Sequence, residues 1–147
     1  MKKPCYWTCF GFENIQPHIQ HCTHKFLGFQ HKDSLKDISD LLDTYFALNP
    51  IAPFRATFNK EDFFGFYKNL RVLRPADESP FLFPLKQQLD AFRKDDFPVY
   101  QPHLTPKGSK YITSLSFNVN AYYLMEDENI LKTFAFKTPN PQNPQSN

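Results

Sequence analysis

Two motifs of the same form, His-x-Thr, stand far apart in this chain. The first comprises His21 and Thr23, and the second comprises His103 and Thr105. In an extended strand, residues i and i+2 point to the same face, so each motif would place an imidazole beside a hydroxyl group. If the two segments lie together in the fold, two imidazoles and two hydroxyl groups meet at one place.

This set of groups suits the cleavage of a phosphodiester by acid–base chemistry. One group must take a proton from the attacking hydroxyl or water, another must protonate the leaving oxygen, and donors must hold the charge on the phosphoryl oxygens. The ordinary pKa of histidine is close to neutral pH, so one ring can be neutral while the other is charged. Two histidines and two threonines therefore satisfy these requirements, and we expect neither a metal ion nor a cofactor.

The composition fits one globular domain with a substantial core. A chain of 147 residues can bury about two thirds of its unfolded surface. Its 17 Phe and 7 Tyr favour aromatic-rich strands. The formal net charge of +2 is far from the strongly basic balance of a protein that binds duplex DNA, so we expect no such partner.

Cysteine usage and hydropathy favour a reducing compartment. The three cysteines, Cys5, Cys9 and Cys22, are an odd number and cannot all form disulfides with one another. The apolar run after Lys2 and Lys3 is only about eight residues long, which is too short to span a membrane. We therefore expect a cytoplasmic protein without a membrane partner.

The apolar patterns predict an α+β fold. Aromatic and alternating segments indicate strands at residues 6–12, 21–29, 54–59, 69–74, 115–121 and 131–137, with turns at 60–67 and 106–109. The apolar stripe from Leu35 to Phe46 predicts an amphipathic helix that ends at Asn49 and Pro50. A second helix is expected within residues 79–94, before the segment 97–105 that carries the second motif.

The residues after the first motif carry a family resemblance. The run from His21 to Gly28, His-Cys-Thr-His-Lys-Phe-Leu-Gly, resembles the first signature of the two-histidine (2H) phosphoesterase superfamily. That superfamily includes 2′-5′ RNA ligase-like proteins and cyclic nucleotide phosphodiesterases. The His103-Leu104-Thr105 motif resembles its second signature, and the order of strands and helices is similar over about residues 6–137. The chain departs from the pattern at His24 and at Pro106, where apolar residues are usual.

This resemblance implies a bilobal fold, with two antiparallel-sheet lobes around a central cleft and helices on the outer face. The domain would be residues 1–137, followed by a disordered tail rich in Pro, Asn and Gln at 138–147. By position, His21 and His103 would be the acid and the base, in either order. Thr23 and Thr105 would hold phosphate oxygens.

Four further residues are candidates for binding substrate. Tyr6 and Trp7 have rings that can stack on a nucleobase, a mode typical of single-stranded or small nucleotide ligands. Lys25 and Lys107 can neutralise phosphate charge, and Lys107 is favoured because it closely follows the second motif.

The function implied is a metal-independent phosphodiesterase that hydrolyses small oligonucleotides or cyclic nucleotides. Viral and phage members of the superfamily destroy oligonucleotide immune signals, and we favour a substrate of this kind. One alternative is an RNA end-processing enzyme, a 2′,3′-cyclic phosphodiesterase or 2′-5′ RNA ligase-like protein. Another is a non-catalytic RNA-binding module of the same fold. Linkage, base preference and oligomeric state are not indicated by the sequence.

A zinc site is an alternative use of the same region. Cys5, Cys9, His21 and His24 are residue types that bind zinc. Against it, His21 and His24 would face opposite sides of an extended strand, so we do not favour a metal there.

The other polar residues near the first motif have plainer interpretations. His18 lacks a hydroxyl two residues later, because Gln20 stands there, and we expect His18 in a loop. By alternation, Cys22 and His24 should point away from the cleft.

Overall fold

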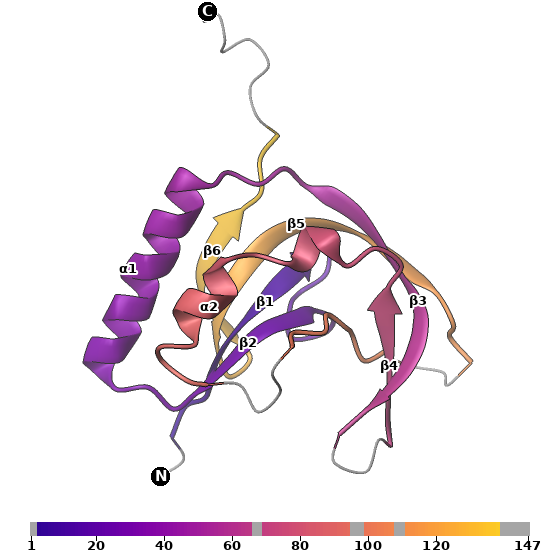
Figure 1. The fold of residues 1–147 in the computed structure, drawn as a ribbon, viewed down its shortest axis with the longest axis horizontal. Helices are drawn as coiled ribbons and strands as arrows, with labels where there is room; N and C mark the ends of the chain where they lie inside the picture. Colours follow the sequence, from indigo (N-terminus) through magenta and orange to yellow (C-terminus); the bar gives the residue numbers. More distant parts are fainter. Residues whose placement is uncertain (1–2, 66–68, 95–98, 108–110, 139–147) are drawn as a thin grey trace, which may run out of the picture.

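An antiparallel sheet and two helices make up the fold, which confirms the α+β prediction (Figure 1). The computed structural model describes residues 3–65, 69–94, 99–107 and 111–138. The predicted tail therefore lies outside the described residues except for residue 138, as do parts of the two predicted turns. In chain order the elements are β1 (Tyr6–Phe12), β2 (Cys22–Gly28), α1 (Lys32–Leu48), β3 (Phe54–Phe64), β4 (Leu70–Pro75), the 3-10 turn η1 (Ser79–Phe81), α2 (Leu85–Leu89), β5 (Leu115–Glu126) and β6 (Asn129–Ala135).

The strands form one sheet in the order β2-β1-β5-β3-β4, and β6 also pairs with β5. All of these pairs are antiparallel. Strand β5 is the link between the two expected lobes, because it pairs with β1 on one side and with β3 over its first residues. Strands β3 and β5 are strongly curved, so β3 and β4 bend away from β1 and β2 (Figure 1).

Aromatic rings fill the space between the sheet and the helices. Phe10 of β1 is fully buried and meets the rings of Phe81 and Tyr122 edge-on, with centroids 5.0 and 5.5 Å away. From α1, Phe46 stacks on Phe134 of β6 with a centroid distance of 4.9 Å. The helices therefore cover one face of the sheet, which we call the helix side.

One helix agrees with the prediction at its C-terminal end, and the second helical region does not. Helix α1 runs from Lys32 to Leu48 and ends at Asn49 as expected, with Ile38 and Leu42 buried. The second helical region is shorter than expected, since only residues 79–81 and 85–89 are helical. Pro80 and Pro84 lack a backbone N–H donor, which explains why one continuous helix does not form. No helix in the described part of the chain is long and apolar enough to cross a membrane.

The β3–β4 hairpin is longer than predicted, because β3 continues through Phe64. The ladder pairs Glu61 with Leu73 and Asp62 with Val72. Arg71 bonds Glu61 across the two strands, and this ion pair helps to keep polar residues in a strand that their propensity disfavours. The prediction of a turn at 60–64 was therefore wrong.

Strand β2 contains a β-bulge that changes which residues face the helix side. Cys9 of β1 lies opposite Thr23, but its neighbour Thr8 lies opposite Lys25. His24 is thus an extra residue in the ladder. As a result both His24 and Lys25 are buried on the helix side, with 2% and 1% of their surfaces exposed.

Candidate active site

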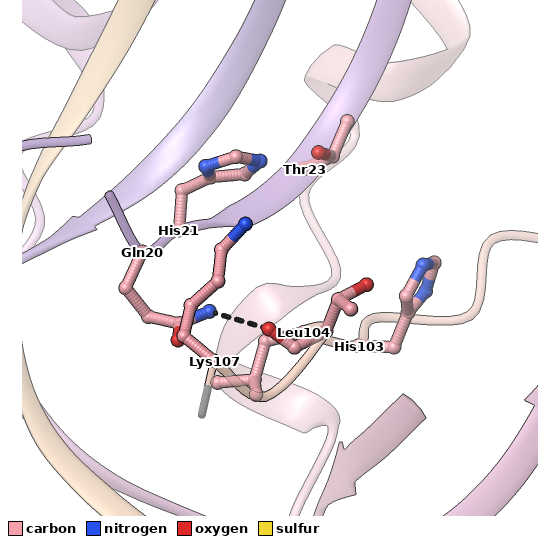
Figure 2. A pocket seen from close by; sticks show the side chains of 7 residues that line it. Gln20, His21, Thr23, His103, Leu104 and Lys107 are labelled. Carbon is pink, nitrogen blue, oxygen red and sulfur yellow. Dashed lines mark hydrogen bonds between the residues drawn. The ribbon is translucent and has the colours of Figure 1, made fainter. Parts of the chain in front are cut away.

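A pocket of about 210 Å³ lies where the two His-x-Thr motifs meet (Figure 2). It is lined by side chains of both motifs and by their neighbours: Gln20, His21, Thr23, His103, Leu104, Thr105 and Lys107. Figure 2 shows His21 and Thr23 on one side of the pocket, facing His103 across it. The fold therefore brings together all four residues on which the sequence prediction rested.

Alternation along β2 places the first motif. Cys22 is fully buried and His24 is bonded on the helix side, where its Nδ1 lies 2.6 Å from the Tyr122 hydroxyl. His21 and Thr23, which alternate with them, consequently face the opposite side of the sheet, where the pocket lies. We call this opposite face the cleft side.

The second motif is placed by a single buried leucine. Leu104 is 1% exposed, and its backbone exchanges two hydrogen bonds of 2.9 Å with Leu73 of β4. This is an isolated β-bridge, so the motif is extended locally without belonging to a full strand. Because Leu104 points inward, His103 and Thr105 on either side of it are turned to the pocket.

Side-chain hydrogen bonds hold the two motifs in register. Gln20, 7% exposed, donates from Nε2 to the backbone oxygen of Thr105 at 3.0 Å, as Figure 2 shows. The Tyr100 hydroxyl donates to the backbone oxygen of Thr23 at 2.8 Å and also lies 3.8 Å from the Cys22 sulfur. These contacts tie the 99–107 segment to β2 and to the residues just before it.

The two histidines are oriented in the same way. Nδ1 of His21 lies 2.5 Å from the carbonyl oxygen of Pro17, and Nδ1 of His103 lies 2.8 Å from that of Gln101. A carbonyl oxygen can only accept, so each Nδ1 carries the proton and donates it. In the neutral ring Nε2 is then the free base, and in the charged ring Nε2–H is a donor. Each ring can therefore exchange a proton with a ligand through Nε2.

An aromatic ring packs against each catalytic candidate. The Trp7 ring lies 4.5 Å from the His21 ring, and the Phe64 ring of β3 lies 4.3 Å from the His103 ring, both measured between centroids. The two imidazoles are thus supported from opposite sides of the pocket and kept partly out of water.

Burial sets the protonation of both rings. It lowers the pKa of His21, and the positive charges of Lys107 and His103 lower it further, although the Pro17 carbonyl acts in the opposite direction. Burial also lowers the pKa of His103, with Arg74 adding to the effect while the Gln101 carbonyl and Asp62 oppose it. Both rings therefore favour the neutral state at neutral pH more than an exposed histidine does.

The fold is shared with several solved structures. The crystal structure of E. coli LigT complexed with NADP+ matches with a TM-score of 0.65 and 17% sequence identity, over 93% of this chain and 100% of that one. A protein described as a phosphoesterase matches with a TM-score of 0.64 and 16% identity, over 92% of this chain and 100% of that one. The chain has the LigT-like 2H phosphoesterase fold.

The similarity to these proteins lies in the fold and not in the sequence. No protein-family model matches the chain, and no curated protein is significantly similar to it. A third solved relative in fold, LigT complexed with 3′-AMP, is 13% identical at a TM-score of 0.62, with 93% of this chain and 100% of that chain covered. The chain therefore shares this fold at 13–17% sequence identity.

Two of the residues predicted to bind substrate lie elsewhere. Lys25 is buried on the helix side, and its Nζ lies 2.6 Å from Asp90 at the end of α2, because the bulge at His24 shifts the alternation. Tyr6 is 6% exposed and its hydroxyl bonds Glu126. Adjacent residues of a strand face opposite sides, so only Trp7 of the Tyr6–Trp7 pair reaches the cleft side. Lys107 lines the pocket, and its contact with substrate stays a prediction.

Three lining or neighbouring residues were not predicted. In the sequence, Gln20 only distinguishes His18 from His21, and Leu104 is simply the middle residue of the second motif. Phe64 lay in a predicted turn. The burial of Gln20 and Leu104 follows from contacts with segments distant in sequence, for which the local pattern gave no signal. His18 itself is exposed in a turn, as expected.

The zinc alternative has no support in the described residues, where no three His, Cys, Asp or Glu side chains are grouped so as to hold a metal ion. His24 faces away from His21 and bonds Tyr122. Burial raises the pKa of the Cys22 thiol to about 12 and that of Cys9 further, so neither is poised to act as a thiolate at neutral pH.

Proposed function

We propose that this protein is a metal-independent phosphodiesterase that acts on small oligonucleotides or cyclic nucleotides. The observation that supports it most is the convergence of two His-x-Thr motifs and Lys107 on one pocket. Each histidine is held by a backbone carbonyl at Nδ1, which leaves Nε2 for proton transfer. The 2H phosphoesterase fold agrees with this chemistry.

In the proposed reaction, one imidazole in its neutral form takes a proton from the attacking water or ribose hydroxyl. The new P–O bond forms while the bond to the leaving oxygen breaks, and the second imidazole, in its charged form, donates its Nε2 proton to that oxygen. The hydroxyls of Thr23 and Thr105 donate to the non-bridging oxygens, and Lys107 offsets their negative charge. The two histidines exchange roles if the reaction runs in reverse, and either order of acid and base fits the pocket.

Within this class we favour an oligonucleotide or cyclic nucleotide that serves as an antiviral signal, so that the enzyme would disarm that signal. RNA end processing is the second candidate. It is favoured by the crystal structures of LigT with 3′-AMP, ATP and NADP+, because those ligands are nucleotides with terminal phosphates or esters.

A substrate screen in excess EDTA tests the proposed function. We expect product from at least one of three classes: a cyclic dinucleotide, a 2′-5′ oligoadenylate and a 2′,3′-cyclic nucleotide. EDTA should not reduce the rate, because proton transfer and charge neutralisation come from side chains. Tight binding without product from any class would favour a non-catalytic RNA-binding module. A rate that EDTA abolishes and zinc restores would favour the metal alternative.

The pH dependence of kcat/KM offers a separate test. We expect a bell-shaped profile with its maximum on the acid side of pH 6.5, since one ring must be neutral and the other charged, and the pKa of each lies below 6.5 in the free protein. Steady-state rates between pH 4.5 and 8.5 on the best substrate measure this profile. A maximum well above neutral pH would contradict the assignment of both proton transfers to these rings.

A further inference from the structure

A row of aromatic and basic side chains, half-buried at Trp7 and exposed at Phe26 and Arg93, continues from the pocket along the cleft side of β1 and β2. It comprises Trp7, Phe26 and Arg93, which we call the outer patch. Phe26 is 46% exposed, and the Arg93 guanidinium lies over its ring at 4.9 Å from the centroid. Neither Phe26 nor Arg93 lines the pocket.

The strand register places the outer patch beside the first motif. Trp7 lies directly opposite Phe26, and Cys9 lies directly opposite Thr23, so the members of each pair share a face of the sheet. Trp7 is two residues from Cys9 and therefore on the same face. At a rise of about 3.3 Å per residue, the Trp7–Phe26 pair is about 7 Å along the sheet from Thr23.

Trp7 makes the patch continuous with the pocket. Its ring packs against His21 with a centroid distance of 4.5 Å, and its indole N–H donates to the backbone oxygen of Asp127 at 2.9 Å. The ring is thereby held in place between His21 and the Phe26 position. A ligand that extends from the pocket along β2 would meet Trp7 first and Phe26 next.

Arg93 supplies a cation suited to a phosphate. No carboxylate of the described residues forms an ion pair with it. A guanidinium that stacks on a ring keeps its N–H groups at the edge of the stack, where they can bind a phosphate in bidentate fashion. Phe26 therefore orients Arg93 without occupying its donors.

The size of the pocket favours such an extension. Its volume of about 210 Å³ is below the roughly 300–1,000 Å³ of pockets that enclose a drug-sized ligand. A substrate of several nucleotides would therefore extend beyond it. Proteins that bind single-stranded nucleic acid without sequence preference combine aromatic rings, which stack on bases, with basic groups, which contact the phosphates.

We propose that the outer patch binds the nucleotide that adjoins the scissile phosphate in a single-stranded oligonucleotide substrate. Arg93 contacts the next phosphate, and the rings of Trp7 and Phe26 contact the base. This inference rests on the proposed function, because the pocket supplies the position of the scissile phosphate. It makes short single-stranded oligonucleotides, longer than a dinucleotide, the preferred substrate class.

Binding measured separately from turnover tests the proposal. Fluorescein-labelled tetra-adenylate and di-adenylate, each in 2′-5′ and 3′-5′ linkage, are titrated against the His103→Ala variant with fluorescence anisotropy as readout. Adding Arg93→Ala should weaken tetra-adenylate binding about tenfold, the scale of one charge-assisted hydrogen bond, and leave di-adenylate binding unchanged. Phe26→Ala should weaken the binding of both lengths, because the base that adjoins the scissile phosphate is present in each.

Arg55→Ala is the matched control, since Arg55 is an exposed arginine on β3 that bonds Asn118 and lies outside the patch. It should leave both affinities unchanged. For Arg93→Ala, equal losses of affinity for the two lengths, or no loss for tetra-adenylate in either linkage, would overturn the proposal. Turnover by the wild-type protein separates the two hypotheses. If product forms but Arg93→Ala does not weaken tetra-adenylate binding, only the proposal for the outer patch is refuted. If Arg93→Ala weakens binding but no product forms, only the proposed catalytic function is refuted.

Discussion

Alanine at position 21 or at position 103 is expected to lower kcat by about a hundredfold or more, the usual scale for the loss of general acid or base help. Both imidazoles line the pocket. Each donates from Nδ1 to a backbone carbonyl, which leaves Nε2 to exchange a proton with the substrate. The rate on the substrate found in the screen, measured under saturation, is the readout. Each loss should be of similar size, because either proton transfer can limit the reaction.

The control for this prediction is His18→Ala, which removes an exposed imidazole three residues before His21. It should keep the wild-type rate. Circular dichroism should show that both pocket variants remain folded, since neither ring belongs to the core between sheet and helices. A near-normal kcat in His21→Ala or His103→Ala would show that the site lies elsewhere.

Replacement of Phe10 by alanine is expected to lower the free energy of unfolding by about 3–5 kcal/mol. Phe10 is fully buried and its ring meets those of His24, Phe81, Phe83 and Tyr122 within 5.5 Å between centroids. Removal of the ring leaves a cavity among side chains that the sheet and helices hold in place, so little of it can collapse. Urea unfolding monitored by circular dichroism gives the change.

Phe63→Ala provides the comparison, because it deletes the same ring from a side chain that is 45% exposed. Phe63→Ala should lower the free energy of unfolding by less than about 1 kcal/mol. Similar costs for the two variants would mean that Phe10 does not sit at the centre of the core.

The four residues of the two motifs were predictable because alternation is a local property. His21 and Thr23 reach the pocket through the period of two in β2, and Leu104 preserves the same period around His103 and Thr105 even though only one bridge forms there. The chemistry of these residue types is the basis of the proposed reaction. The α+β class followed in the same way from apolar periods.

Lys25 and Tyr6 were predicted to lie at the substrate site but do not, because the face that each occupies depends on how its strand pairs with its neighbours. The bulge at His24 exists only relative to the ladder with β1, so the face that Lys25 occupies depends on a register that the β2 residues do not encode. For Tyr6 and Trp7, the aromatic character was evident, but which of two neighbours faces the cleft depends on the side that the helices cover.

Gln20 and Phe64 were missed because their roles come from contacts across long sequence separations. Gln20 bonds the backbone of Thr105, 85 residues away. Phe64 reaches His103 only because β3 continues beyond the predicted turn. Such contacts become visible once the sheet order brings the segments together.

The attachment of the second motif determines how the cleft responds to a ligand. Among the described residues, backbone-to-backbone bonds of the 99–107 segment to the sheet are confined to the Leu73–Leu104 bridge. The side chains of Gln20 and Tyr100 supply further links, each to a backbone oxygen of the other segment. Together with the buried Leu104 side chain, these few contacts fix the position of His103 and Thr105 relative to β2. A phosphate that touches both motifs would therefore add one more link between β2 and the 99–107 segment, and a ligand of this kind should protect that segment from local opening.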